Sequence, residues 1–187
     1  SEKLTANFSF GYDHYDYRND ESVEEAAAAR LSFAINQWFG KVDFSYKLDN
    51  NHTLNFGLMS QFYNINSGTY EPLHESSLVK WDQLQKDKAL ESAIYIGDQW
   101  EVTPKLSVNA GIRYSMFNLL GPRTYYTYQD GMLPSSTTVV DSVSVGGGKV
   151  VKTYQGPEFR LSARYAFNDD FSVKAGFNTM RQYIHKV

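Results

Sequence analysis

Apolar and polar residues alternate along most of this chain, and three stretches repeat the alternation in one ungapped thirteen-residue pattern. Each stretch opens with an aromatic residue, passes through a short polar turn and then resumes the alternation; the three are 46–58, 100–112 and 165–177. Side chains on a strand point alternately to two faces, so a period of two gives one apolar and one polar face. The repeat therefore predicts antiparallel hairpins that build a membrane-spanning β-barrel wall.

Seven segments carry the alternation and are predicted to be strands. They are 4–18, 28–48, 53–65, 89–102, 106–117, 158–167 and 171–184. The alternation shifts phase near 36–38, which predicts a one-residue bulge there. The alanine run at 26–29 is interpreted as a continuation of the strand rather than as a helical turn.

The connections between these strands are alternately short and long. The short turns are 49–52, 103–105 and 168–170. The long connections are 19–27, 66–88 and 118–157. Outer-membrane barrels sort their connections in this way, with short turns on the periplasmic side and long loops outside. Within the longest connection, the glycine run at 146–148 between two valine-rich segments predicts a β-hairpin with a glycine turn.

The composition excludes several classes of protein. No run of about 18 apolar residues occurs, so a transmembrane helix is excluded. The chain has no cysteine, so disulfides are excluded. Its net charge is −3 with both signs interspersed, which gives no electrostatic argument for nucleic-acid binding. No spacing of serine, histidine or acidic residues suggests a catalytic or metal site, so we expect no enzyme activity, no metal and no cofactor.

The expected fold class is all-β, an antiparallel up-and-down transmembrane β-barrel segment. Each strand has the roughly 9–11 residues that cross a bilayer. Seven strands are too few to close, and about 27 residues per strand suits a large barrel, so we expect about seven strands of a 22-stranded barrel. Residues 1–187 then form a single partial domain. No signal peptide is visible, which indicates either a mature protein or an internal piece of a longer one. The strand pattern at both ends favours the internal piece.

The last strand pair resembles the barrel of TonB-dependent outer-membrane receptors, especially those of Bacteroidota. That family often carries a P-R-x-S-x-R-Y hairpin, a short turn, an S-x-K-A-x-Y/F strand and then QYIH. The corresponding residues here are Pro157, Arg160, Ser162, Arg164, Tyr165, Ser172, Lys174, Ala175, Phe177 and 182–185. Segment 94–115 resembles a second strand pair of the family, with Asp98 and Arg113 in place, and 57–72 resembles a strand running into an outer loop.

The resemblance implies a barrel with an N-terminal plug, located in the outer membrane of a Gram-negative bacterium and driven by TonB. The implied partners are outer-membrane lipid, TonB acting through a plug domain that this chain does not contain, and a surface lipoprotein. The implied function is a share in the wall of a receptor that imports a siderophore, glycan or peptide. Two alternatives stay open: a passive porin or structural outer-membrane barrel, and a soluble carbohydrate-binding β-sandwich.

Two sets of residues recur at fixed positions of the thirteen-residue repeat. Tyr46, Trp100 and Tyr165 precede the three turns, which predicts an aromatic girdle at the periplasmic interface rather than core aromatics of a soluble sheet. A lumen-facing glycine occupies another position of each repeat: Gly57, Gly111 and Gly176. These glycines are interpreted as points of wall curvature, with a contact layer for the plug as the alternative.

Two further sets are candidates for binding. The predicted lumen-facing basic residues are Arg113, Arg160, Arg164 and Lys174. They would hold acidic plug residues or guide an anionic ligand, unless they form ordinary ion pairs with neighbouring lumen residues such as Asp98 and Glu101. Because loops on a rigid scaffold usually carry binding, aromatic loop residues are candidate ligand contacts, with solvated loop tips as the alternative. These are Tyr125, Tyr126, Tyr128 and Trp81.

The two rows of strand 106–117 give the first testable prediction. Replacing Ile112 on the apolar row with arginine places a charge in lipid and should lower the free energy of unfolding by about 2–4 kcal/mol near the midplane. Ser107→Arg should be tolerated, because that arginine would face a wet lumen. A refolding titration of the parent barrel measures both variants, and equal damage from the two would refute the assignment of faces.

Overall fold

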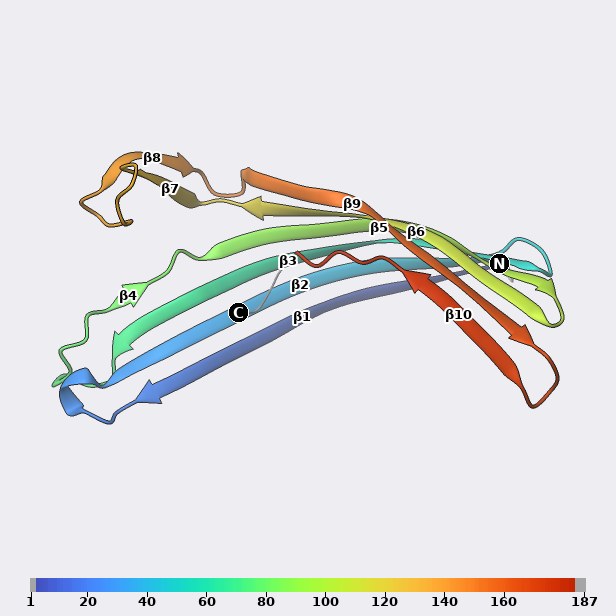
Figure 1. Cartoon of the computed structure of the whole chain (residues 1–187), viewed down its shortest axis with the longest axis horizontal. Coiled ribbons are helices and arrows are strands. Elements are labelled where there is room, and N and C mark those ends of the chain that lie inside the picture. Colours follow the sequence, from blue (N-terminus) through green and yellow to red (C-terminus); the bar gives the residue numbers. More distant parts are fainter. Residues whose placement is uncertain (1–2, 184–187) are drawn as a thin grey trace.

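A computed structural model describes residues 3–183, which form one curled antiparallel sheet (Figure 1). Its seven main strands pair in chain order: β1 (Leu4–Glu21), β2 (Ala29–Lys47), β3 (His52–Pro72), β5 (Asp87–Thr103), β6 (Leu106–Leu120), β9 (Val150–Ala166) and β10 (Ser172–Asn178). The short β4 (Asp82–Gln83) pairs with β3, while β7 (Arg123–Tyr128) and β8 (Val139–Val145) form a separate hairpin. The predicted all-β up-and-down arrangement of seven strands is confirmed.

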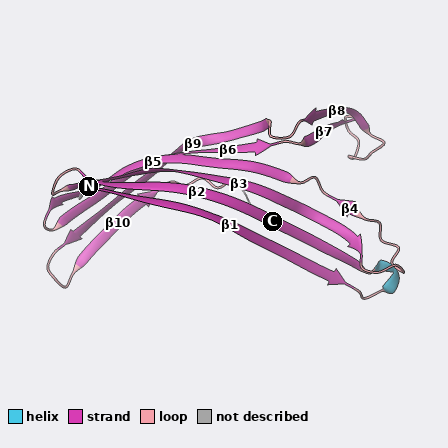
Figure 2. Cartoon of the chain, turned by 180° about the vertical axis from the view of Figure 1, so that it is seen from behind, coloured by secondary structure: helices cyan, strands magenta, loops and turns pink. Residues whose placement is uncertain are grey.

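The sheet is a single layer, seen from behind in Figure 2. Within the described residues the buried hydrophobic side chains are few: Ala28, Ala29, Ala89, Ala93 and Phe117. In contrast, Phe8, Phe10 and Ile94 are 77%, 76% and 65% exposed. A β-sandwich packs two sheets face to face and buries such residues between them. The soluble sandwich is therefore wrong as an interpretation of this chain.

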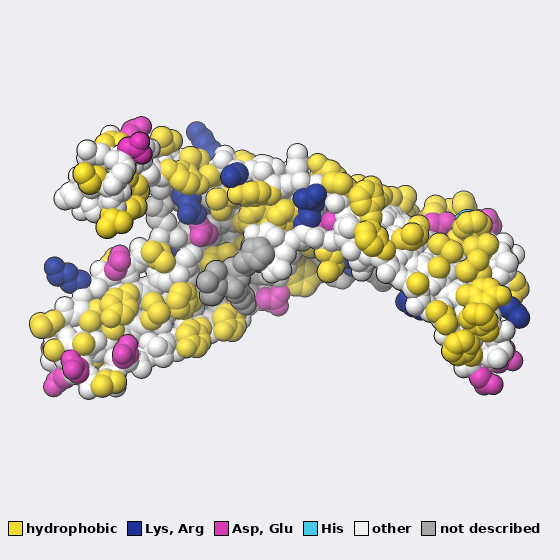
Figure 3. All heavy atoms as spheres, viewed as in Figure 1, with side chains coloured by type: hydrophobic (Ala, Val, Ile, Leu, Met, Phe, Trp, Pro, Cys, Tyr) yellow, Lys and Arg dark blue, Asp and Glu magenta, His cyan; other side chains and the backbone are white. Residues whose placement is uncertain are grey.

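Strand register sorts the side chains into an apolar face and a polar face. On one face Ile112 lies opposite Ile96 on β5 and Phe159 on β9, so apolar residues continue from strand to strand. On the other face Asn109 lies opposite Gln99 and Ser162. Figure 3 shows exposed hydrophobic side chains spread along the whole length of the sheet. No helix among residues 3–183 is long and apolar enough to cross a membrane.

The bulge predicted at 36–38 is wrong in position. Both partners of β2 keep an unbroken register there, and the shift lies instead between Ser32 and Ala34, where β3 carries one additional residue. Because β2 itself does not change phase, Phe33 shares the polar face with Lys41, and it packs against Tyr17 with ring centroids 6.4 Å apart. The phase shift in the sequence therefore records a change of residue type along one face.

The strands run further into the long connections than the alternation indicates. β1 continues to Glu21, β3 to Pro72 and β6 to Leu120. Between β1 and β2 the chain forms a 3-10 helix, η1 (Glu25–Ala27), before β2 begins at Ala29. The interpretation of the alanine run as strand is therefore wrong for residues 26–27.

The glycine-turn hairpin predicted around 146–148 is also wrong. β8 pairs with β7, whereas the segment after the glycines begins β9 and pairs with β6. The glycines lie where the chain returns from the projecting hairpin to the main sheet; Gly148 N donates to Gly121 O at 3.0 Å. A valine-rich strand fits either neighbour equally well, so local pattern alone did not distinguish the two pairings.

The predicted strand 171–184 ends early, at Asn178, and residues 184–187 lie outside the described part of the chain. The backbone of Phe159 forms its hydrogen bond on the side of β10, where Thr179 N donates to the Phe159 carbonyl at 2.9 Å. In an antiparallel ladder every second residue bonds to the same side, so Pro157 also faces β10 and lacks the N–H that would continue the ladder. The chain instead crosses the polar face, where Tyr183 stacks on Phe117 with centroids 5.4 Å apart.

All three short turns are closed by the same side-chain bonds. The first residue of each turn, Asp49, Thr103 or Asn168, accepts hydrogen bonds from the backbone N–H groups two and three residues later, at 2.7–3.2 Å. Short polar side chains close turns in this way. In the sequence, a short polar residue at the fourth position of the thirteen-residue repeat indicates these side-chain hydrogen bonds.

Asp49 makes the first turn sensitive to pH. The N–H groups of Asn51 and His52 hold its pKa below the ordinary value of 3.8. A lowered folded-state pKa stabilises the fold above pH 3.8, and this contribution is lost as the pH falls through the folded-state pKa. Asp49→Asn should keep the cap, as Asn168 does, and remove this pH dependence. Urea unfolding of both proteins above and below pH 3.8 measures the difference, and identical pH dependence would contradict it.

Candidate functional site

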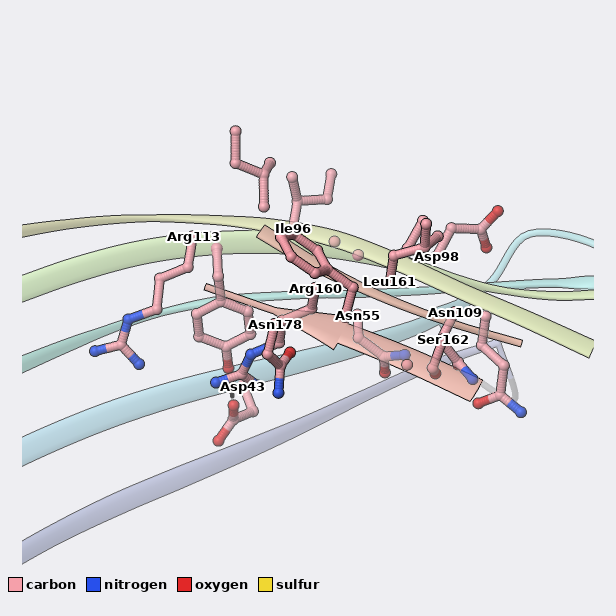
Figure 4. Close-up of a pocket in the computed structure, with 18 of the residues that line it drawn as sticks. Asp43, Asn55, Ile96, Asp98, Asn109, Arg113, Arg160, Leu161, Ser162 and Asn178 are labelled. Carbon is pink, nitrogen blue, oxygen red and sulfur yellow. Dashed lines mark hydrogen bonds between the residues drawn. The ribbon is translucent and has the colours of Figure 1, made fainter. Parts of the chain in front are cut away.

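A hollow of about 840 Å³ lies against the polar face, and residues of β2, β3, β5, β6, β9 and β10 line it (Figure 4). Strands so far apart in the sheet share one hollow only on the inner side of its curl, so the polar face is the concave one. In Figure 4 Asp43, Asn55 and Asn109 point to this side, whereas Ile96 points to the other. The apolar face is therefore the convex outer face.

A tyrosine crosses this concave face between β5 and β2. Tyr95 Oη donates a hydrogen bond to Asp43, whose second oxygen lies 2.9 Å from Lys41 Nζ. To reach Asp43 the ring lies over Gly57 on the intervening strand, and a Cβ at residue 57 would lie 2.5 Å from Tyr95 Oη and overlap the carbonyl of Val42. Gly57 is thus required by close approach. An aromatic residue on a polar row was the only sequence signal for this contact.

The other two repeat glycines lie under different local constraints. A Cβ at Gly111 would lie 3.2 Å from Ile96 O, because Gly111 faces Gly97 across a close pair of strands. A Cβ at Gly176 would make only ordinary contacts, at 3.5 Å from Leu161 O and from Ser162 Cβ. The wall itself therefore does not require glycine at residue 176. Both wall curvature and a plug contact stay predictions for these positions.

Arg113 is held between two glutamates on the concave face. Its guanidinium lies 3.9 Å from Glu91 and 3.7 Å from Glu158. Glu158 is buried and also accepts a hydrogen bond of 2.8 Å from Ser115 Oγ. Ser115 Oγ lies 2.8 Å from Tyr183 Oη, so the segment after β10 covers this network. The positive charge of Arg113 is thus balanced within the wall.

Neither Asp98 nor Glu101 pairs with the basic residues of the concave face. Asp98 lies on the apolar face, where its carboxylate contacts His52 Nδ1 at 2.6 Å beside Trp100. Glu101 accepts a hydrogen bond of 3.4 Å from Gln99. The suggestion that Asp98 is a lumen residue is wrong, because its even position places it on the same side of β5 as Trp100.

Arg160, Arg164 and Lys174 differ from Arg113 in their surroundings. No carboxylate among residues 3–183 lies within 4.0 Å of any of the three cations. Arg164 Nε donates to Ser172 Oγ at 3.3 Å, and all three side chains are exposed. The structure therefore brings three of the four predicted basic residues together, without an acidic partner in the part of the chain that it describes.

The three repeat aromatics, Tyr46, Trp100 and Tyr165, lie on the apolar face next to the short turns. His52 stacks on Trp100 with ring centroids 5.4 Å apart, and Phe167 meets Tyr165 edge-on at 4.8 Å. His52 was missed from sequence because histidine does not continue an apolar row. The common level of these rings suits an interfacial girdle, and that role stays a prediction.

The β7–β8 hairpin is attached to the segment that precedes β5. The Gln85 side chain bonds the backbone of Thr124 twice, accepting from its N–H at 3.0 Å and donating to its carbonyl at 3.1 Å. Arg123 pairs with Asp87 beside this contact. Two long connections are therefore joined at the end of the sheet away from the short turns.

The candidate ligand aromatics lie on these joined connections. Tyr126 and Tyr128 are neighbours on one side of β7, with centroids 6.5 Å apart, while the Arg123 guanidinium lies 5.4 Å from the Tyr125 ring. Trp81 is 61% exposed, and no ring contact joins it to the tyrosines within the described residues. In the same residues no group of three or more histidine, cysteine or acidic side chains is placed to hold a metal.

The glycine geometry gives a matched pair of substitutions. Gly57→Ala should destabilise the parent barrel by about 1–3 kcal/mol, because its methyl group overlaps both the backbone of β2 and the Tyr95 ring. Gly176→Ala should be close to neutral, because the space for a Cβ is already present. Equilibrium unfolding in urea measures both. A neutral Gly57→Ala would show that Tyr95 does not lie across β3.

Comparison with known proteins places this geometry in a family. The family model described as TonB dependent receptor-like, beta-barrel matches residues 2–180. No curated protein matches the chain. Among solved structures, that of the copper transporter OprC matches with a TM-score of 0.67 and 11% sequence identity. The match covers 95% of this chain and 29% of the OprC chain, so this chain spans less than a third of that structure.

A structural match at 11% identity shows the fold alone, whereas the family model covers nearly the whole chain. The family consists of transporters rather than enzymes, and its barrels sit in the outer membrane of Gram-negative bacteria. The exposed apolar face of the curled sheet is the surface that such a location requires. This chain belongs to the TonB-dependent receptor-like β-barrel family.

Proposed function

We propose that these seven strands form part of the wall of a 22-stranded receptor that imports a nutrient across the outer membrane with energy from TonB. The family match over residues 2–180 is the observation that carries this proposal. The curled single layer supports it, since a wall with one apolar and one polar face separates lipid from a wet lumen. The concave face is then the lumen side, and the convex face contacts lipid.

The two ends of the sheet have different proposed locations. The capped short turns and the aromatic row next to them suit the periplasmic side. The opposite end carries η1, β4 and the β7–β8 hairpin, which suits the outer surface, where long loops of such barrels lie. Loops held on a rigid wall usually carry ligand contacts, so Tyr125, Tyr126, Tyr128 and Trp81 are the proposed nutrient contacts.

The whole receptor would contain parts beyond this wall segment. TonB acts in this family through a plug domain inside the barrel, so we propose that the parent carries such a plug. The residues of the last strand pair favour a receptor of the Bacteroidota type, in which a surface lipoprotein is a further proposed partner. Tyrosine-rich loops favour a glycan, peptide or siderophore as the nutrient, because aromatic rings pack against sugars, peptides and aromatic ligands.

The proposal predicts energy-dependent uptake by the parent receptor. Accumulation of a labelled nutrient, chosen by screening oligosaccharides, peptides and ferric siderophores, should stop when TonB is deleted or the proton gradient is collapsed. Binding to the outer surface should persist in both cases. Uptake that continues without TonB would instead support the passive porin. Replacing Tyr125, Tyr126 and Tyr128 with alanine should weaken binding of the nutrient to the outer surface, because these residues are its proposed contacts. Leu133→Ala, on the same connection, is the control.

A further inference from the structure

Three cations at the β9–β10 edge of the concave face differ from the two cations nearer its middle, Lys41 and Arg113, which have carboxylate partners. Lys41 lies 2.9 Å from Asp43, and Arg113 lies between two glutamates. Arg160, Arg164 and Lys174 have no such partner within the described residues. This edge therefore carries a cluster of three positive charges that no carboxylate within the described residues compensates.

Register places these cations in a compact block. On β9 the block contains Arg160, Ser162 and Arg164; opposite them lie Asn178, Gly176 and Lys174 on β10, and Gly111, Asn109 and Ser107 on β6. The neutral side chains are amides and hydroxyls, which can donate hydrogen bonds, and no carboxylate occurs at any of the nine positions. Most of these residues line the concave hollow.

Two features of the block indicate the ligand that it fits. Arg164 and Lys174 are directly opposite each other, an arrangement of like charges that destabilises a sheet unless an anion lies between them. Arg160 and Arg164 lie four residues apart on one face, about 13 Å along the strand. One small anion cannot reach both, whereas two carboxylates four residues apart on an extended polypeptide have the same spacing.

We propose that this block binds an acidic, extended segment of the plug domain, with one carboxylate between Arg164 and Lys174 and another at Arg160. A transported solute leaves the lumen between cycles and cannot offset a permanent repulsion, whereas a resident segment can. The neutral amides and hydroxyls then bond the peptide groups of that segment. Gly176 leaves room for it, since the wall itself does not require glycine there. This inference rests on the proposed function, which supplies the plug.

Zero-length coupling tests the contact directly, because Lys174 is the only amine of the block. A carbodiimide that joins amines to carboxylates is applied to the parent receptor in isolated outer membranes, and the joined peptides are mapped by mass spectrometry. Lys174 should couple to an aspartate or glutamate of the plug. Coupling of Lys41 to Asp43, 2.9 Å apart, is the internal positive control.

Two variants sharpen the result. Lys174→Arg keeps the charge and removes the amine, so its coupling should vanish while Lys41 still couples. Arg164→Glu supplies a carboxylate opposite Lys174, so the coupling should move from the plug to the introduced side chain. Coupling of Lys174 to another protein or to an added polycarboxylate, or no coupling when Lys41 couples, would overturn the inference.

The uptake assay separates failure of this inference from failure of the proposed function. TonB-dependent uptake without coupling of Lys174 to the plug would overturn the docking site and leave the importer intact. If Lys174 is cross-linked to the plug but uptake does not depend on TonB, the proposed energy supply is wrong and the docking site still holds.

Discussion

The backbone of a strand in lipid has no water to bond, so each N–H and C=O group in the bilayer must find its partner in a neighbouring strand. Antiparallel pairing with the neighbouring strand satisfies these backbone groups, and a tight turn brings two consecutive strands together at each short connection. The order β1-β2-β3-β5-β6-β9-β10 is the result. The outer edges of β1 and β10 have no strand partner among residues 3–183, and in a membrane further strands would have to pair with them. The side-chain pattern and the turn caps serve this ladder.

The two faces of the ladder meet opposite requirements. On the convex face, apolar residues stay exposed because lipid is their solvent, and the His52–Asp98 pair lies near the turns, where headgroups and water begin. On the concave face, water permits charge, and the wall compensates it by contacts across strands, as Tyr95, Asp43 and Lys41 do. The β9–β10 edge gathers three cations without a carboxylate partner among the described residues, which is why it indicates an interface.

Much of the fold could be predicted from sequence because the period of two is local. The main strands, their faces and the three capped turns follow from alternation and from the residue type at each turn. Errors arose where the decision depended on a distant partner. β8 could pair with β7 or with the following strand, and the start of β9 was decided by its contact with β6. The end of β10 depended on Pro157, a residue of another strand.

The candidate site divides in the same way. The sequence by itself determined that Arg113, Arg160, Arg164 and Lys174 share one face, because parity along a strand is fixed by backbone geometry. Only the tertiary structure decided that Arg113 is balanced by Glu91 and Glu158 while the other three lack an acidic partner among the described residues. It likewise decided that Gly57 makes room for a tyrosine. Such contacts join residues far apart in the chain, and their register depends on the whole ladder.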